Sequence, residues 1–184
     1  IDTNKPNVAA AALEAGASII NDVSPGLHES KLYESISLGD SAMVLMHNYD
    51  RSKSSDVVAD IIEDFQPMVE MALRSGVSEK HIILDPGSGF GKTVNQNLEI
   101  LRRLDEFSIL GMPLLLGMSR KSSIGRVLKL PVEERLEGTA ATVAIAISRG
   151  VDIVRVHDVL QMKRVALMTD AVLRCPYFDE DQYD

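Results

Sequence analysis

Short, almost continuous apolar runs recur along the chain, and each ends in a polar or small residue. These runs are SIIND, AMVLMH, HIILD, MPLLLGMS and DIVRVH, at residues 18–22, 42–47, 81–85, 112–119 and 152–157. Their length and their lack of alternation are typical of parallel strands covered on both faces. The opening residues IDT read as the tail of another strand. The pattern therefore predicts six parallel strands.

Segments with helix-like patterns lie between these runs, at residues 6–16, 29–39, 56–76, 95–107, 134–150 and 159–174. Several of them end in a glycine directly before the next strand, and glycine suits the left-handed conformation that often follows a helix. These glycines are Gly16, Gly39, Gly76 and Gly150. The repeat of strand, polar loop and helix can be counted six times.

Alternating strands and helices allow either a doubly wound open sheet or a (β/α)8 barrel. Polar residues at the strand ends favour the barrel, because all strand ends meet at one mouth there, whereas in an open sheet only those near a switch point converge. We therefore expect an α/β fold, with the third to eighth units of a TIM barrel in residues 1–174 and an acidic tail in residues 175–184. The polar residues are Asp2, Asn21, His47, Asp85, Ser119, Arg155 and His157.

Composition narrows the possible partners. The net charge of -8 and the absence of Trp argue against a nucleic-acid partner. The single cysteine, Cys175, excludes an internal disulfide and a cysteine-based zinc site. No apolar run approaches the ~20 residues of a membrane span, and the cytoplasm is the default compartment.

Two side chains near the last predicted strand suggest an anion site. Arg155 and His157 lie two positions apart, so a strand places both on one face. Together they can bind a phosphate or diphosphate through charge-assisted hydrogen bonds. The alternative is an Arg–carboxylate pair at the strand end beside a solvated histidine.

Three short acceptors, Asp2, Asn21 and Asp85, end three other strands. They could read the donor edge of an amino-pyrimidine ring. Since a buried carboxylate must find donors, an inward aspartate either faces a substrate or pairs with Lys121 or Arg155.

The segment GMSRKSS at residues 117–123 offers hydroxyls and two cations around a tight turn, which suits an anionic or aromatic-amine substrate; the alternative is a basic, solvated loop. We expect one of its cations to point inward and the other to pair at the surface. His47 has no partner at metal-ligand spacing and is interpreted as structural, and no cluster of metal ligands is evident.

The glycine-rich stretch DPGSGFGKT at residues 85–93 matches neither common nucleotide motif. A P-loop would need glycine at position 86, which is proline, and the dinucleotide fingerprint would need glycine at position 92, which is lysine.

Over residues 1–160 the chain resembles dihydropteroate synthase in the order and spacing of six segments. These segments are IDT, IIND, LMH, LDPGSGFGKT, LLLGMSRKSSIG and VRVHDV. The resemblance implies the condensation of 4-aminobenzoate with 6-hydroxymethyl-7,8-dihydropterin diphosphate to give 7,8-dihydropteroate and diphosphate. It also implies Mg²⁺, a homodimer and a target of sulfonamides.

The resemblance also assigns roles to individual residues. Asp2, Asn21 and Asp85 would hydrogen-bond the pterin, Met46 would pack near its ring, and Gly117 would let the backbone approach closely. Lys121 would contact both substrates. Phe90 and Ser122 would line the aminobenzoate pocket, and Arg155 and His157 would hold the diphosphate. Lys121, Arg155 and His157 are thus the expected catalytic residues.

The chain departs from the family pattern at two places. The family's opening strands, with an Asn that helps to bind diphosphate and Mg²⁺, have no counterpart, so no metal ligand is expected here. Ser88 also replaces a bulkier apolar residue. Two alternatives stay open: a pterin-dependent methyltransferase of the same superfamily, against which the SRKS segment argues, and an inactive pterin-binding fragment.

Overall fold

The strands form one parallel array whose spatial order follows the chain. The computed structural model describes residues 1–23, 30–37 and 41–174. In it, β1 to β3 form one sheet in that order, and β4 pairs with β5. Bridges from Asp2 to Asn21 and from Leu84 to Leu114 connect these pieces. Within the described part the order does not reverse, so the array lacks the switch point of a doubly wound sheet. The strands are β1 (Ile19–Asp22), β2 (Ala42–Met46), β3 (Ile82–Asp85), β4 (Leu115–Leu116) and β5 (Ile153–Val154).

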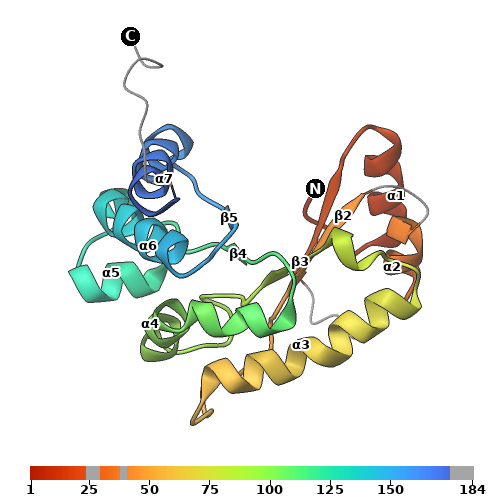
Figure 1. Ribbon diagram of the computed structural model, residues 1–184, viewed down its shortest axis with the longest axis horizontal. Coiled ribbons are helices and arrows are strands. Elements are labelled where there is room, and N and C mark those ends of the chain that lie inside the picture. Colours follow the sequence, from red (N-terminus) through yellow and green to blue (C-terminus); the bar gives the residue numbers. More distant parts are fainter. Residues whose placement is uncertain (24–29, 38–40, 175–184) are drawn as a thin grey trace.

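Helices surround this array on its outer side (Figure 1). They are α1 (Pro6–Glu14), α2 (Ser30–Ser37), α3 (Val57–Arg74), α4 (Val94–Arg102), α5 (Ser122–Leu128), α6 (Leu136–Ser148) and α7 (Val159–Arg174), with short 3-10 helices at Glu79–His81, Leu104–Leu110 and Val132–Glu134. The mixed α/β class with parallel strands is confirmed. Three of the predicted helix-ending glycines, Gly16, Gly76 and Gly150, have positive φ. Gly39 and the acidic tail lie outside the described residues.

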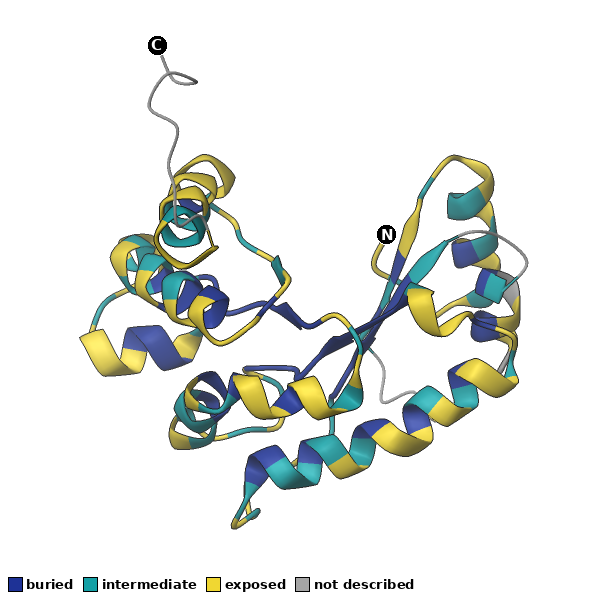
Figure 2. Cartoon of the chain, viewed as in Figure 1, coloured by how far each residue is buried: buried dark blue, intermediate teal, exposed yellow. Residues whose placement is uncertain are grey.

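Strand side chains alternate between two apolar layers. Ile20, Leu45 and Leu84 face outward into the main core, which they share with Ile61 and Phe65 of α3. A smaller inner layer consists of Val44, Ile83 and Leu115, with Ala42 and Ile153 packed against them. Burial in Figure 2 is concentrated along the strands and on the strand-facing sides of the helices. The inner layer leaves room for a site at the ends of the strands.

Helix α5 differs from the prediction. The sequence pattern treats the segment that follows Lys121 as a turn or loop, but Ser122–Leu128 form a helix of seven residues. A Cβ on Gly125 would lie 2.2 Å from Nη2 of Arg135, so the missing side chain makes room for that guanidinium. Arg135 also donates to the carbonyl oxygens of Arg120 and Leu130. The short helix is thus held by a more distant residue, a contact that local periodicity cannot reveal.

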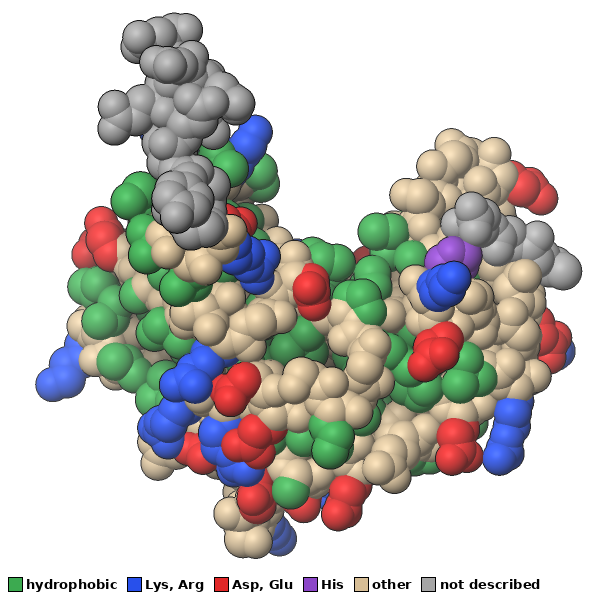
Figure 3. Space-filling model, in the orientation of Figure 1, with side chains coloured by type: hydrophobic (Ala, Val, Ile, Leu, Met, Phe, Trp, Pro, Cys, Tyr) green, Lys and Arg blue, Asp and Glu red, His purple; other side chains and the backbone are tan. Residues whose placement is uncertain are grey.

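Strands β4 and β5 are also shorter than the apolar runs that predicted them, with two residues each. The two ends of the array, at Asp2 and at β5, are connected by a side-chain contact between Arg155 and Asp2. The surface is hollowed between the α1 side and the α7 side in the view of Figure 3. Among the described helices, none combines the length and the apolar character needed to cross a membrane.

Candidate active site

The strand register places the predicted pterin residues on the inner face of the array. Asn21 pairs with Val44, whose side chain belongs to the inner layer, and Asp2 bridges to Asn21. Met46 pairs with Asp85, two residues beyond Val44 and Ile83. Since side chains two apart share a face, Asn21, Met46 and Asp85 all point to the inner side.

A pocket of about 310 Å³ lies at the C-terminal ends of the strands. Five of the predicted site residues line it together with Ser119 and Val156: Asp2, Gly117, Lys121, Arg155 and His157. These residues come from three separate parts of the chain. The predicted convergence of strand-end side chains is therefore observed for this set. The other five predicted site residues are not among the lining residues: Asn21, Met46, Asp85, Phe90 and Ser122.

The side chain of Asn21 is held on one side and presents an acceptor on the other. Its Nδ2 donates to Oδ1 of Asp2 at 2.8 Å, which fixes the orientation of the carboxamide. Among the described residues, none donates a hydrogen bond to its buried Oδ1. Because a buried acceptor without a donor is costly, a ligand N–H at this point would be favoured.

Asp85 is a buried carboxyl group, 3% exposed, at the end of β3. Its Oδ1 accepts a hydrogen bond from the backbone N–H of Gly87 at 2.8 Å. Burial raises the pKa of Asp85, while that hydrogen bond and the nearby charges of Lys121, Arg155 and Lys92 oppose the rise. The carboxyl group thus faces cations but forms no ion pair with any side chain of the described part of the chain, and it can accept hydrogen bonds from a ligand.

The two neighbouring cations of the SRKS segment point in different directions, as predicted. Arg120 pairs with Asp158, with Nε 2.8 Å from Oδ2. Lys121 turns inward, donates to the carbonyl oxygen of Ser88 and lies 4.8 Å from the centre of the Phe90 ring. Burial lowers the pKa of Lys121 to about 8, against the opposing attraction of Asp85. A cation of this kind can approach both a ring carbonyl and a flat aromatic amine.

Arg155 and His157 lie at the mouth of the pocket. Arg155 Nη1 is 3.4 Å from Oδ2 of Asp2, so the Arg–carboxylate alternative is realised, but both side chains remain about half exposed. The imidazole Nδ1 of His157 lies 2.9 Å from Oγ of Ser119, which also accepts from the backbone N–H of His157. A weak, exposed ion pair of this type does not prevent Arg155 from binding an anion.

His47 is structural, as predicted. It is fully buried, and its Nε2 lies 2.8 Å from Oδ2 of Asp64 on α3. It therefore faces the helix layer and not the pocket, although its position at a strand end also placed it among the side chains expected at the mouth.

Sequence reasoning missed two residues that shape the glycine turn, defined here as residues 86–91. Lys92 contacts carbonyl oxygens of this turn, and Asn97 of α4 accepts from the backbone N–H of Gly89 at 2.6 Å. The sequence pattern gave no signal for Asn97, because its burial and its partner eight residues away are seen only in the structure.

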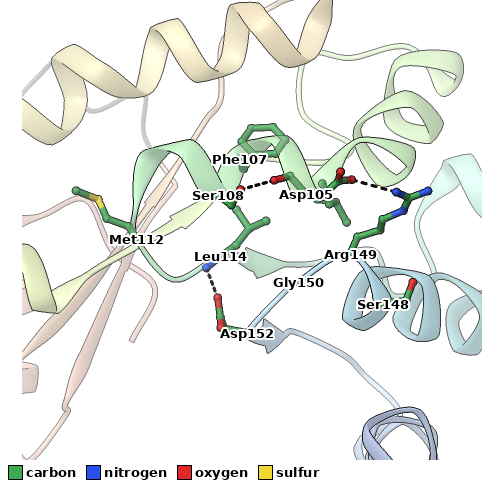
Figure 4. Close-up of a pocket in the computed structure, with 10 residues that line it drawn as sticks. Asp105, Phe107, Ser108, Met112, Leu114, Ser148, Arg149, Gly150 and Asp152 are labelled. Atoms are coloured by element: carbon green, nitrogen blue, oxygen red, sulfur yellow. Dashed lines mark hydrogen bonds and ion pairs between the residues drawn. The ribbon is translucent and has the colours of Figure 1, made fainter. Parts of the chain in front are cut away.

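A second, larger pocket of about 530 Å³ lies near the N-terminal ends of β4 and β5. Its polar side chains already have partners (Figure 4): Arg149 pairs with Asp105 at 3.3 Å, and Asp152 accepts from the N–H of Leu114 at 2.9 Å. Active sites of (β/α)8 barrels lie at the opposite end of the strands. The smaller pocket is therefore the better candidate.

A metal site made of protein side chains alone needs several ligands close together. Among residues 1–23, 30–37 and 41–174, no group of three or more His, Cys, Asp or Glu side chains could hold a metal ion. This result concerns protein ligands alone, whereas Mg²⁺ is usually held by one or two carboxylates together with substrate phosphates.

Comparison with known proteins agrees with this geometry. The family model described as pterin binding enzyme matches residues 1–157. The chain belongs to this family. Among its relatives, the dihydropteroate synthase of Bacillus subtilis is 50% identical over 173 residues, which cover 94% of this chain and 61% of the relative.

Two solved dihydropteroate synthases have the same fold over nearly the whole chain. The Clostridium difficile enzyme, solved in the presence of pteroic acid, has a TM-score of 0.90 and 46% identity, over 95% of this chain and 66% of that one. The Thermus thermophilus enzyme, in complex with 6HMPPP, has a TM-score of 0.86 and 38% identity, over 93% of this chain and 68% of that one. This family member thus spans less than two thirds of the B. subtilis relative's length.

Proposed function

We propose that this chain carries the substrate pocket of a dihydropteroate synthase. The reaction joins 4-aminobenzoate to 6-hydroxymethyl-7,8-dihydropterin diphosphate and releases 7,8-dihydropteroate and diphosphate. The observation that carries the proposal is the shared inner face, where the acceptors Asn21 and Asp85 lie near the cations Lys121 and Arg155. The pteroic acid and 6HMPPP of the two similar structures support this substrate class.

The acceptors suit the pterin end of the reaction. The amino-pyrimidine edge of a pterin presents N–H donors, which the free Oδ1 of Asn21 and the carboxyl group of Asp85 can accept. Met46, 1% exposed, lies opposite Asp85 in the strand register and shares its face. Gly117 has no side chain, and a Cβ there would lie 3.5 Å from Nε of Arg155.

The cations suit the leaving group and the second substrate. The aniline nitrogen attacks the exocyclic carbon of the pterin, the C–O bond breaks, the diphosphate leaves with the electron pair, and the aniline nitrogen then loses a proton. Because an aniline is a neutral nucleophile, no strong base is required. Arg155 and His157 would stabilise the charge that grows on the diphosphate. Lys121 and Phe90 would orient the aminobenzoate with Ser122.

The barrel architecture of the chain is also part of the proposal. We assign the parallel array to the third to eighth units of a (β/α)8 barrel, in residues 1–174, because its order follows the chain and the similar structures are dihydropteroate synthases. A homodimer in the cytoplasm and Mg²⁺ as cofactor of the whole enzyme are further expectations from the family resemblance.

The test is aminobenzoate-dependent release of diphosphate, together with calorimetric binding of a pterin diphosphate analogue with and without Mg²⁺. The proposal expects binding and release that requires aminobenzoate. Binding without release would indicate an inactive pterin-binding fragment. Methyl transfer from a methylated pterin to a corrinoid protein, without diphosphate release, would indicate the methyltransferase alternative.

A further inference from the structure

Lys92 is a partly buried cation outside the pocket, and its ammonium group touches both the glycine turn and the end of β2. Its Nζ lies 2.8 Å from the carbonyl oxygen of Phe90 and 3.2 Å from that of Gly87. On the other side it lies 3.0 Å from Nδ1 of His47 and 3.3 Å from the carbonyl oxygen of His47. An ammonium has three N–H donors, and these four acceptors surround it.

The histidine is prepared as an acceptor for this cation. Nε2 of His47 faces the carboxylate of Asp64, so the proton of a neutral ring belongs on Nε2 and Nδ1 is left to accept from Lys92. Burial and the nearby charge of Lys92 lower the pKa of His47 to about 4, which keeps the ring neutral near pH 7. Arg51 in turn holds Asp64, with Nε 2.8 Å from Oδ2. A continuous series of contacts runs from Arg51 to the turn.

The glycine turn needs outside contacts because its backbone is unusually free. Gly87, Gly89 and Gly91 all have left-handed φ values, of 66°, 85° and 58°. Glycine has more conformational freedom than any other residue in the unfolded and locally open states. Carbonyl oxygens at both ends of the turn are fixed by Lys92, which therefore restricts the conformations available to Phe90.

The turn connects Lys92 to the pocket. The carbonyl oxygen of Ser88 accepts from Nζ of Lys121, and the ring of Phe90 lies 4.8 Å from the same atom. Lys92 and Lys121 thus hold the turn through different carbonyl oxygens. We infer that Lys92 is a positioning residue that sets the turn conformation and, through it, the placement of the Phe90 ring for aminobenzoate. The part about aminobenzoate rests on the proposed function; the part about the turn does not.

An apolar side chain of similar length provides the direct test. K92M fills the space and removes the hydrogen bonds, and K80M, at an exposed lysine before β3, is the matched control. In NMR spectra of the full chain, K92M should shift the amide signals of Gly87, Gly89 and Gly91 and leave those of the distant Gly16, Gly111 and Gly150 in place. K80M should change neither group.

The kinetic readout separates positioning from a general structural role. K92M should raise the KM for 4-aminobenzoate about tenfold and leave the affinity for a pterin diphosphate analogue within about twofold, because only the turn is displaced. Aminoethylation of K92C in a C175S background recreates an ammonium at the same distance and should restore the wild-type values. D64N, which replaces the carboxylate facing His47 by a neutral amide and changes no residue of the turn, should shift the same glycine signals by a smaller amount.

Two results would overturn the inference. The first is that the amide signals of the turn glycines stay unchanged in K92M. If K92M does not fold, the same result in D64N would count. The second is an equal loss of aminobenzoate and pterin binding that aminoethylation does not restore. If the wild-type chain binds no pterin, the proposed function fails, while the glycine signals still decide whether Lys92 holds the turn.

Discussion

Arg155 Nη1 lies 3.4 Å from Oδ2 of Asp2, although the two residues are 153 positions apart in the sequence. The contact joins the first and last segments of the parallel array at the mouth of the pocket. Both partners are about half exposed, so the pair should contribute no more than ~1 kcal/mol to stability. This position suits a cation that can leave its carboxylate for a diphosphate.

Substitution of Arg155 tests that role. R155A should lower kcat by about 100-fold, because charge on the leaving group develops in the transition state, and it should weaken binding of a pterin diphosphate analogue much less. Its free energy of unfolding should change by less than about 1 kcal/mol. Steady-state kinetics and urea unfolding provide the two measurements. If only the KM for the pterin substrate rises, Arg155 does not act on the leaving group.

The polar residues at the ends of the apolar runs made part of this site predictable. Asn21, Asp85 and Arg155 end apolar runs, and a parallel register is enough to bring such ends to one edge. Tertiary contacts determine the rest. Lys92 reaches His47 across 45 positions, and Arg135 holds α5 through the space left by Gly125. Neither contact has a local signature, because periodicity reports which face of an element is apolar and not which partner meets it.

Lys121 should impart a pH dependence to substrate binding. Burial lowers the pKa of its ammonium group to about 8, so the charge is present below that pH and is lost as the pH rises through it. Affinity for the pterin diphosphate analogue should therefore fall above about pH 8. In K121R the fall should move to higher pH, because a guanidinium stays charged.

The neighbouring arginine serves as the control for this titration. Arg120 pairs with Asp158 away from the pocket, so R120Q should keep the wild-type pH profile. Lys92 also has a pKa lowered to about 8 by burial, with Asp85 opposing that change. Because K92M should leave the affinity for this analogue within about twofold, a fall near pH 8 that persists unchanged in K121R would show that Lys121 is not the titrating group.

Gly87 should tolerate no side chain. Its φ is +66°, and a Cβ would lie 1.8 Å from the carbonyl oxygen of His47, which is backbone and cannot move aside. G87A should cost about 3 kcal/mol of stability or more and displace the turn. Gly111 has a similar φ of +70° with nothing within 4 Å, so G111A should cost only about 1 kcal/mol. If urea unfolding shows equal losses of stability in G87A and G111A, the positive φ alone explains the cost, and the contact with His47 adds nothing.

His47 should make the fold sensitive to acid. Its pKa in the folded chain is lowered to about 4, mainly by burial, so the unfolded chain binds the proton first as the pH falls below about 6.5. The stability contributed by the neutral ring is complete above pH 6.5 and is lost as the pH falls toward 4. Over this window the free energy of unfolding should decrease by about 3 kcal/mol, at about 1.4 kcal/mol per pKa unit.

A glutamine variant isolates this contribution. H47Q should start from a lower stability at pH 7 but lose less between pH 6.5 and 4, since the titrating ring is gone. Asp64 adds its own loss only below this window, because hydrogen bonds from Arg51 and His47 outweigh the effect of its burial and hold its pKa below its usual value. Parallel slopes for wild type and H47Q in urea unfolding across this pH range would assign the acid sensitivity to groups other than His47.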